Sequence, residues 1–325
     1  MLKSYNEETG EVELEDAQKP ITIKQLFTHT SGLSYGFYPG VPIDELYQEK
    51  FNFGEKKTAL PRDDRLRAVL ETSFPPLEEF SQSLATLPLK FEPDDHFCYS
   101  FAHDILGLLV EKLSGKKFDE FLKERIFNKI GMIDTDFFVP PEKRERLVEA
   151  YTRNQEGNLV RVTGNIREGF NHKPKMLAGG TGLVSTLNDY LKFCIMMLNG
   201  GKYEGVQVIS EETIDLMTSN QLPQGKSFLE MQMVQPEDPE IIKRNTGYGF
   251  GLGVLVKTAE NMLKSGIGDY GWAGALNTTF RIDPANKVIF IVLTQYCPVD
   301  NNWIAPIDTL KISDLVYESL EKSGE

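Results

Sequence analysis

The stretch that decides the fold is Leu87–Gly115, LPLKFEPDDHFCYSFAHDILGLLVEKLSG. Its first part predicts an extended loop, because two prolines disfavour a helix and the Asp94-Asp95 pair is typical of a turn. From Ala102 onwards apolar residues recur at helical spacing until the Ser-Gly pair at the end. A loop therefore leads into a helix, and Tyr99 lies at the junction.

Tyr99 is the chemically interesting residue of this stretch. The start of a helix offers unpaired N–H groups and the positive end of the helix dipole. We therefore expect the Tyr99 phenol to lose its proton more easily than a free tyrosine, whose pKa is about 10. The alternative is a tyrosine that simply packs at a helix start.

The composition describes an acidic globular chain. It has 325 residues, of which 40% are hydrophobic and 26% charged, with a net charge of −13 and a pI near 5.0. This length allows a large core, and the acidic balance disfavours nucleic acid and anionic membranes as partners. No apolar run approaches the roughly 18–20 residues that a membrane span needs.

Cysteine and histidine are too sparse for a metal or disulfide framework. The three cysteines, Cys98, Cys194 and Cys297, are far apart and odd in number. The four histidines show no zinc-binding spacing. The sequence therefore predicts no metal and no cofactor.

Two other motifs invite a catalytic interpretation that we reject. His29 lies in ITIKQLFTHTSGL (21–33), with no acid or nucleophile placed around it, so we do not expect it to act as a catalytic residue. Gly32–Gly36 matches the G-x-S-x-G nucleophile elbow around Ser34, but a helix is predicted before it where the elbow needs a strand.

The remaining pattern predicts helices first and strands last. Helices are expected within 44–86, with segments at 63–71 and 76–87, and again over 116–127. The capping residues Thr22 (with Gln25), Thr186 (with Asp189) and Ser210 predict the starts of three further helices. The segment 221–245 is predicted to be a long loop over a substrate entrance, or an insertion. Strands are expected at 247–256, 278–282 and 288–294, with a turn at 283–286. A helix is expected over 307–320, with the apolar positions 310, 315, 316 and 320 packing across the sheet.

The PLKFEP…YSFAHDILGLLVEKLSG stretch, together with 21–33, resembles the serine β-lactamase/penicillin-binding-protein superfamily. The esterase branch related to class C β-lactamases is most similar. This resemblance implies that Tyr99 acts as a base together with a Ser-x-x-Lys pair, and that the His-Thr-Ser-Gly segment at 29–32 is a structural helix end. Phe101 stands where class C β-lactamases carry asparagine, and it cannot hydrogen-bond a β-lactam amide.

A second match is Tyr270–Ala275, YGWAGA, which resembles the Trp-Gly-Gly motif of the esterase branch. The resemblance makes Trp272, Ala273, Gly274 and Ala275 the wall of the acyl site, with the Ala275 N–H as an oxyanion-hole donor. Trp272 replaces a cation that recognises the β-lactam carboxylate, which favours neutral esters. The alternative is a tight turn with a packed tryptophan.

The implied fold is α/β (α+β), β-lactamase/transpeptidase-like, with an antiparallel sheet flanked by helices plus an all-helical lobe. We expect a single domain over 1–325 with two lobes. The mostly helical lobe would span 41–136, and 137–325 would hold the remaining helices and the C-terminal sheet.

The nucleophile of that family has no convincing counterpart in this chain. The pattern Ser-x-x-Lys occurs at Ser114–Lys117, in a turn between two helices, and at Ser319–Lys322, in the last turn of a helix. Neither suits a buried catalytic helix. We therefore expect that the N-terminal strands and the nucleophile helix of the family are missing, and that this chain alone is inactive.

The leading functional hypothesis is a serine carboxylesterase or acyltransferase that acts on small esters through an acyl-enzyme. One alternative is a catalytically inactive protein that binds a ligand in the same cleft. Another is a β-lactamase or D-amino-acid peptidase. The sequence leaves the oligomeric state open. It shows no targeting segment, which predicts a cytoplasmic chain unless an export signal lies in the missing N-terminal part.

Overall fold

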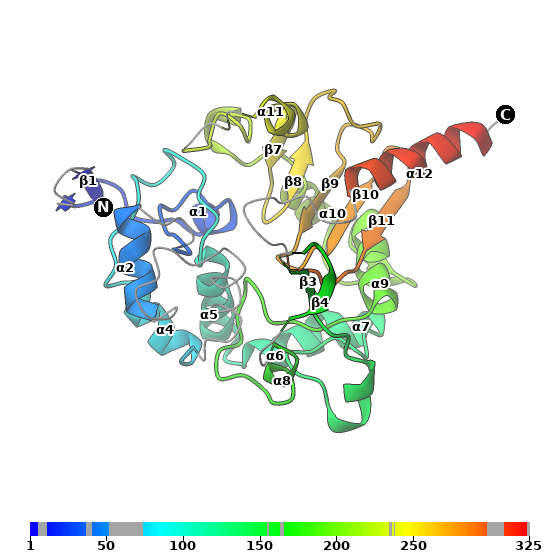
Figure 1. Ribbon diagram of the computed structural model, residues 1–325, viewed down its shortest axis with the longest axis horizontal. Coiled ribbons are helices and arrows are strands. Elements are labelled where there is room, and N and C mark those ends of the chain that lie inside the picture. Colours follow the sequence, from blue (N-terminus) through cyan, green and yellow to red (C-terminus); the bar gives the residue numbers. More distant parts are fainter. Residues whose placement is uncertain are drawn as a thin grey trace.

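The computed structural model describes most of the chain, namely residues 1–5, 12–36, 41–51, 74–154, 156–162, 166–233, 236, 238–297 and 309–323. The predicted helix at 63–71 lies outside them. Helices α1, α2, α4 and α5 gather on one side of the molecule and the main sheet lies on the other (Figure 1).

The main sheet is an antiparallel meander in the order β11-β10-β9-β8-β7. Its strands are β7 (Tyr248–Phe250), β8 (Leu255–Lys257), β9 (Tyr270–Ala273), β10 (Thr279–Asp283) and β11 (Val288–Val292). The predicted β10–β11 hairpin is confirmed, with Asp283 opposite Val288. The single strand predicted at 247–256 is wrong, because the glycine-rich middle turns and divides it into β7 and β8, which pair with each other.

Helix α9 (Leu187–Leu198) packs on this sheet. Thr186 caps it as predicted, since its side chain accepts from the Asp189 N–H. The buried core here is apolar and consists of Cys194, Met196, Met197, Ile214, Val256, Tyr270 and Ile282, with Ile214 contributed by the chain that follows α9. This core holds the sheet in which Trp272 lies on the central strand, β9.

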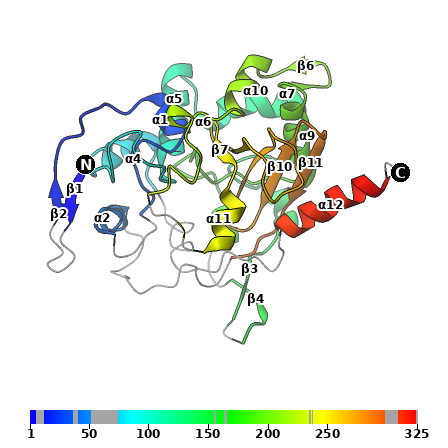
Figure 2. The same ribbon diagram turned by 90° about the horizontal axis from the view of Figure 1, so that it is seen from above.

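Helix α12 (Thr309–Ser323) lies beside β10 and β11 (Figure 2). The Tyr317 hydroxyl donates to Asp283 Oδ2 at 2.8 Å. Two of the predicted packing positions, Leu315 and Leu320, are half exposed. The apolar pattern therefore predicted the helix, but the prediction that Leu315 and Leu320 pack on the sheet is wrong.

The helical side is built from α1 (Ile23–Phe27), α2 (Pro42–Phe51), α4 (Leu77–Leu84) and α5 (Ala102–Ser114). The predicted capping box at Thr22 and Gln25 starts α1. Helix α5 ends at Gly115, whose φ of 68° lies in the left-handed region that glycine adopts without strain. A dense aromatic core joins these helices, made of Tyr47, Phe80 and Phe101 with their apolar neighbours.

The next segment forms α6 (Phe118–Leu122), the π-helical turn Lys123–Phe127 and α7 (Asn128–Ile130). The helix predicted over 116–127 is thus present and runs three residues further. Short elements follow, which connect the two sides. They are the 3-10 turn Pro141–Arg146, β3 (Tyr151–Arg153), β4 (Leu159–Arg161), α8 (Ile166–Gly169), β5 (Lys202–Tyr203), β6 (Val206–Gln207) and α10 (Glu211–Met217).

The segment 221–245 is less irregular than predicted. It contains the 3-10 turn Pro223–Gly225 and helix α11 (Pro239–Asn245). The Asp238 side chain accepts from the Glu240 N–H, and Pro239 occupies the first helical position. An Asp-Pro pair of this kind is a sequence pattern that predicts the start of a helix.

Near the N-terminus, β1 (Leu2–Tyr5) and β2 (Val12–Leu14) form a separate two-stranded sheet in the described part of the chain. The predicted mixture of helices with an antiparallel sheet is confirmed. No helix among the described residues is long and apolar enough to cross a bilayer.

Candidate functional site

Tyr99 lies where the extended loop 87–98 meets α5, as the sequence predicts. Backbone hydrogen bonds attach this loop to the chain after α1: the Asp94 N–H donates to the Thr30 carbonyl at 2.9 Å, and the Cys98 N–H to the His29 carbonyl at 2.8 Å. The position of Tyr99 is therefore set from outside its own helix.

Aromatic rings surround the Tyr99 side chain. Its ring centroid lies 5.1 Å from that of Tyr35, 4.7 Å from that of His29 and 5.7 Å from that of Trp272. Trp272 comes from β9, so the structure brings together the two motifs that the sequence singled out. Contacts of this kind bury the ring and leave little water around the phenol.

The prediction of an acidic Tyr99 phenol is wrong. Burial raises its pKa above the ordinary value, a hydrogen bond with the Trp272 side chain lowers it in part, and the Asp104 charge raises it. Removing water penalises the phenolate more than the nearby helix start can offset. In this chain Tyr99 is therefore a neutral phenol at pH 7.

A second buried unit lies behind Tyr99. Asp104, on the first turn of α5, accepts from the Gly180 N–H at 3.2 Å, and burial raises its pKa to about 6. Tyr35 shares a hydrogen bond with this carboxyl, and burial and then the Asp104 charge raise the Tyr35 pKa well above normal. Gly180 is required here, since a Cβ would collide with the Tyr35 hydroxyl.

The other predicted site residues lie at the end of β9. Trp272 is half-buried, whereas Ala273, Gly274 and Ala275 are exposed. The Gly274 N–H donates to the Thr278 carbonyl at 2.7 Å and closes a tight turn towards β10. No hydrogen bond from the Ala275 N–H is found within the described residues. That group is therefore available to a ligand.

The segment after α10 packs beside this turn. The Phe97 N–H donates to the Met231 carbonyl at 2.6 Å. Phe97 contacts Phe228 and Phe250, and Phe250 meets the Trp272 ring edge-on at 5.3 Å between centroids. The surroundings of Tyr99 and Trp272 are thus apolar on this side, as acyl recognition requires.

The rejected G-x-S-x-G match is structural. The Ser34 hydroxyl is buried and donates to Asp44 Oδ1, and the same carboxylate receives the Lys90 ammonium at 3.1 Å. Helix α1, not a strand, precedes it. Ser34 therefore ties two segments together and does not point to solvent.

The two Ser-x-x-Lys matches are also remote from Tyr99. Ser114 ends α5, so the thirteen residues of this helix place it about 20 Å from the start where Tyr99 lies. Its hydroxyl donates to the Val110 carbonyl. Ser319 lies on α12 and donates to the Leu315 carbonyl. Neither hydroxyl is arranged as a nucleophile.

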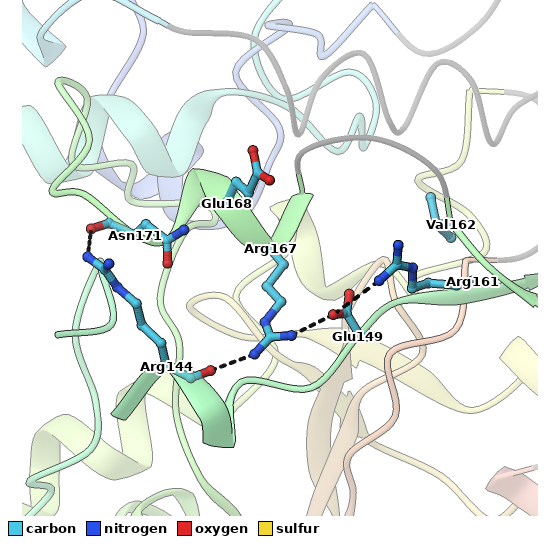
Figure 3. A pocket seen from close by; sticks show the side chains of 7 residues that line it. All are labelled: Arg144, Glu149, Arg161, Val162, Arg167, Glu168 and Asn171. Carbon is cyan, nitrogen blue, oxygen red and sulfur yellow. Dashed lines mark hydrogen bonds and ion pairs between the residues drawn. The ribbon is translucent and has the colours of Figure 1, made fainter. Parts of the chain in front are cut away.

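A cavity of about 330 Å³ lies elsewhere, between α8 and the β3–β4 hairpin (Figure 3). Its arginines bind their own neighbours: Arg167 donates to Glu149 at 2.5 Å and to the Arg144 carbonyl at 2.7 Å. Arg144 donates to the Asn171 carbonyl at 2.8 Å. These bonds crosslink surface segments, and the cavity shares no lining residue with the Tyr99 site.

Among the residues that the structure describes, no cluster of three or more histidine, cysteine or acidic side chains could hold a metal ion. Sequence reasoning missed Tyr35 and Asp104 as neighbours of Tyr99. Tyr35 is distant from Tyr99 in the sequence, and Tyr35 and Asp104 meet where α5 packs against Gly179 and Gly180. It also named His29 only as a helix end.

Comparison with known proteins gives the family. The profile described as Beta-lactamase matches residues 12–301. Protein Rv1367c of Mycobacterium tuberculosis is 31% identical over 290 residues, which are 87% of this chain and 64% of that protein. Lovastatin esterase of Penicillium rubens is 28% identical and is matched over 89% of this chain and 68% of its own length.

Solved structures agree on the fold. The LovD9 mutant of simvastatin synthase from Aspergillus terreus superposes with a TM-score of 0.70 at 22% identity, over 99% of this chain and 74% of that one. EstCE1, described as a hydrolase with promiscuous acyltransferase activity, gives 0.66 at 20% identity, over 93% and 73%. The chain spans about two thirds of the length of its curated relatives. The chain therefore belongs to the β-lactamase family.

Proposed function

We propose that this protein contributes the base and the acyl-binding wall of a serine carboxylesterase or acyltransferase that acts on small esters. The observation that carries the proposal is the contact between Tyr99 and Trp272, which unites the two motifs of the esterase branch. Relatives named lovastatin esterase and monacolin J acid methylbutanoyltransferase support an ester or acyl substrate.

In the proposed reaction Tyr99, as the phenolate that a neighbouring lysine ammonium would stabilise, accepts the proton of a serine hydroxyl while the serine oxygen attacks the ester carbonyl. The ester C–O bond then breaks, and Tyr99 returns this proton to the departing alcohol. Water or a second alcohol attacks the acyl-enzyme in the same way and frees the serine. The Ala275 N–H would stabilise the oxyanion of each tetrahedral intermediate.

The raised pKa of Tyr99 indicates that the reaction needs a further cation near the phenol. Within the described residues Asp104 is the charged group that acts on Tyr99, and its negative charge makes deprotonation of the phenol less favourable. A lysine ammonium within about 4–6 Å would act in the opposite direction. A Ser-x-x-Lys pair would therefore supply both the nucleophile and the cation that activates Tyr99.

The apolar surroundings favour a neutral substrate. Trp272 stands where a β-lactamase carries a cation that recognises the carboxylate of its substrate. Phe101, at the position of the asparagine that binds the β-lactam amide, is buried in the helical core and offers that amide no hydrogen bond. A charged β-lactam would therefore lose hydration without gaining partners. We accordingly place small neutral acyl esters ahead of antibiotics and D-amino-acid peptides.

The test is Tyr99→Phe in the protein expressed from its own gene, with any codons in frame upstream of Met1 included. Hydrolysis of p-nitrophenyl butyrate should fall at least 100-fold, because the base is removed while the ring remains. Unchanged turnover would refute the role of Tyr99. Nitrocefin serves as the β-lactam control, and hydrolysis of it at rates that match the ester would favour a β-lactamase.

A second candidate is a protein that binds an acyl ligand without turnover. The observation in its favour is that both Ser-x-x-Lys matches are remote from a neutral Tyr99. It predicts that residues 1–325 bind a butyrate ester without releasing alcohol. Covalent labelling by a fluorophosphonate, followed by intact mass measurement, separates the two candidates, because only an activated serine is labelled.

A further inference from the structure

We infer that His29 is a positioning residue for Tyr99: its backbone and its ring together fix both neighbours of the tyrosine and one face of the phenol. The inference rests on the proposed role of Tyr99 and adds a residue to that site. The His-Thr-Ser-Gly segment is then more than the end of a helix.

His29 is bonded on both sides of Tyr99 in the sequence. Its carbonyl accepts from the Cys98 N–H at 2.8 Å, and its ring Nδ1 lies 3.2 Å from Ser100 Oγ. His29 and Ser100 are both buried. One residue thus holds the chain immediately before and immediately after the phenol.

Ser100 connects the His29 ring to the start of α5. Its Oγ accepts from the Ala102 N–H at 3.4 Å and lies 3.2 Å from His29 Nδ1. The other ring nitrogen, Nε2, is buried and has no hydrogen-bond partner in the described part of the chain. Burial and the neighbouring His103 lower the pKa of His29 well below normal, so the ring stays neutral.

The ring itself packs between two side chains of the site. It stacks on His103 with centroids 4.2 Å apart and planes 29° apart, and it tilts against Tyr99 with centroids 4.7 Å apart. His103 is fixed in turn, since its Nε2 lies 3.2 Å from the Phe27 carbonyl. Removing the imidazole would therefore leave a hole beside the phenol.

The backbone of His29 adopts the left-handed conformation, with φ of 54°. Asparagine tolerates this region, whereas most residues do not. A helix end alone would be satisfied by glycine or asparagine here. His29→Asn therefore keeps the backbone and deletes the ring, which separates the two roles.

The experiment places 3-fluorotyrosine at position 99 and follows its ¹⁹F resonance against pH. With the ring gone, water reaches the phenol, so His29→Asn should lower the Tyr99 pKa by about one unit. Ester turnover of the same protein should fall about 10- to 100-fold in kcat, with KM nearly unchanged. The exposed His172, changed to Asn, is the matched control and should move neither quantity.

Ser100→Ala is the second variant and keeps the inference testable if His29→Asn fails to fold. It removes the partner of Nδ1, so it should shift the resonance in the same direction by a smaller amount. Adding it to His29→Asn should cause no further shift, because the two act through one bond.

A Tyr99 titration that both variants leave unchanged would overturn the inference, even if the melting temperature fell. The ¹⁹F readout does not depend on catalysis. If Tyr99→Phe retained full ester turnover, the proposed function would fail while the positioning of the phenol would still be measured.

Discussion

The indole of Trp272 and the phenol of Tyr99 lie with ring centroids 5.7 Å apart, one from strand β9 and the other from the loop before α5. The hydrogen bond between these side chains opposes the burial that raises the Tyr99 pKa. Trp272 is thus both a wall of the proposed acyl site and a group that controls the acidity of the proposed base.

Trp272→Phe should raise the Tyr99 pKa further, because it keeps an aromatic ring but removes the indole N–H donor. A shift of about half to one unit is expected, measured by ¹⁹F titration of 3-fluorotyrosine at position 99. Phe228→Leu, which alters the neighbouring aromatic cluster without touching a donor, is the control. Equal shifts in both variants would mean that packing, not the hydrogen bond, sets the pKa.

Gly274→Ala should destabilise the β9 turn by about 1–3 kcal/mol, because the new Cβ would collide with the Thr278 hydroxyl. Thr278→Ala removes the colliding atom, so the double variant should recover most of the loss in urea unfolding. Ala273→Gly restores the glycine of the esterase motif at an exposed position and should change stability by no more than about 1 kcal/mol. A double variant as unstable as Gly274→Ala would contradict the steric argument.

Local patterns in the sequence account for much of the fold. The capping residues Thr22, Thr186 and Ser210 each start a helix as expected, since a cap depends only on residues three positions apart. The turn after Asp283 pairs β10 with β11 for the same reason. The glycines between β7 and β8 mark a turn that strand alternation concealed.

The acidity of Tyr99 could not be predicted from its neighbours in the chain. The helix start argued for a lower pKa, but the rings of Tyr35, His29 and Trp272 bury the phenol, and all three come from other segments. Desolvation depends on tertiary packing and exceeds the effect of a dipole at a helix end. The approach of Tyr99 to Trp272 was expected only because a family resemblance joined the two motifs.

The stability of the protein should fall as the pH rises from about 4 to about 6, through Asp104. Burial raises its pKa in the folded protein to about 6, above the ordinary value of 3.8. The folded state therefore binds this proton more tightly than the unfolded chain does. Over that range the cost of ionising the carboxyl grows to about 2–3 kcal/mol at most.

Asp104→Asn tests this sign, because the amide can still accept from the Gly180 N–H but carries no charge. In urea unfolding at pH 4, 5, 6 and 7, the free energy of unfolding of the variant should increase relative to that of the wild type as the pH rises. Above about pH 6.5 the difference should become constant. If instead the wild type became more stable relative to the variant with rising pH, Asp104 would ionise more easily in the folded protein than in the unfolded chain.

Lys90→Met should be among the most destabilising single changes on the helical side. The ammonium lies 3.1 Å from Asp44 Oδ2, and the two side chains are 3% and 0% exposed. Removing the cation leaves a buried carboxylate without its counter-charge, which costs about 3–5 kcal/mol.

Lys90→Met combined with Asp44→Asn removes both charges, and the amide oxygen can still accept from the Ser34 hydroxyl. The double variant should therefore recover more than half of the loss in thermal or urea unfolding. Lys112→Met is the matched control, since its pair with Glu78 is exposed and should contribute less than about 1 kcal/mol. A double variant less stable than Lys90→Met would show that Lys90 acts through other contacts than its pairing with Asp44.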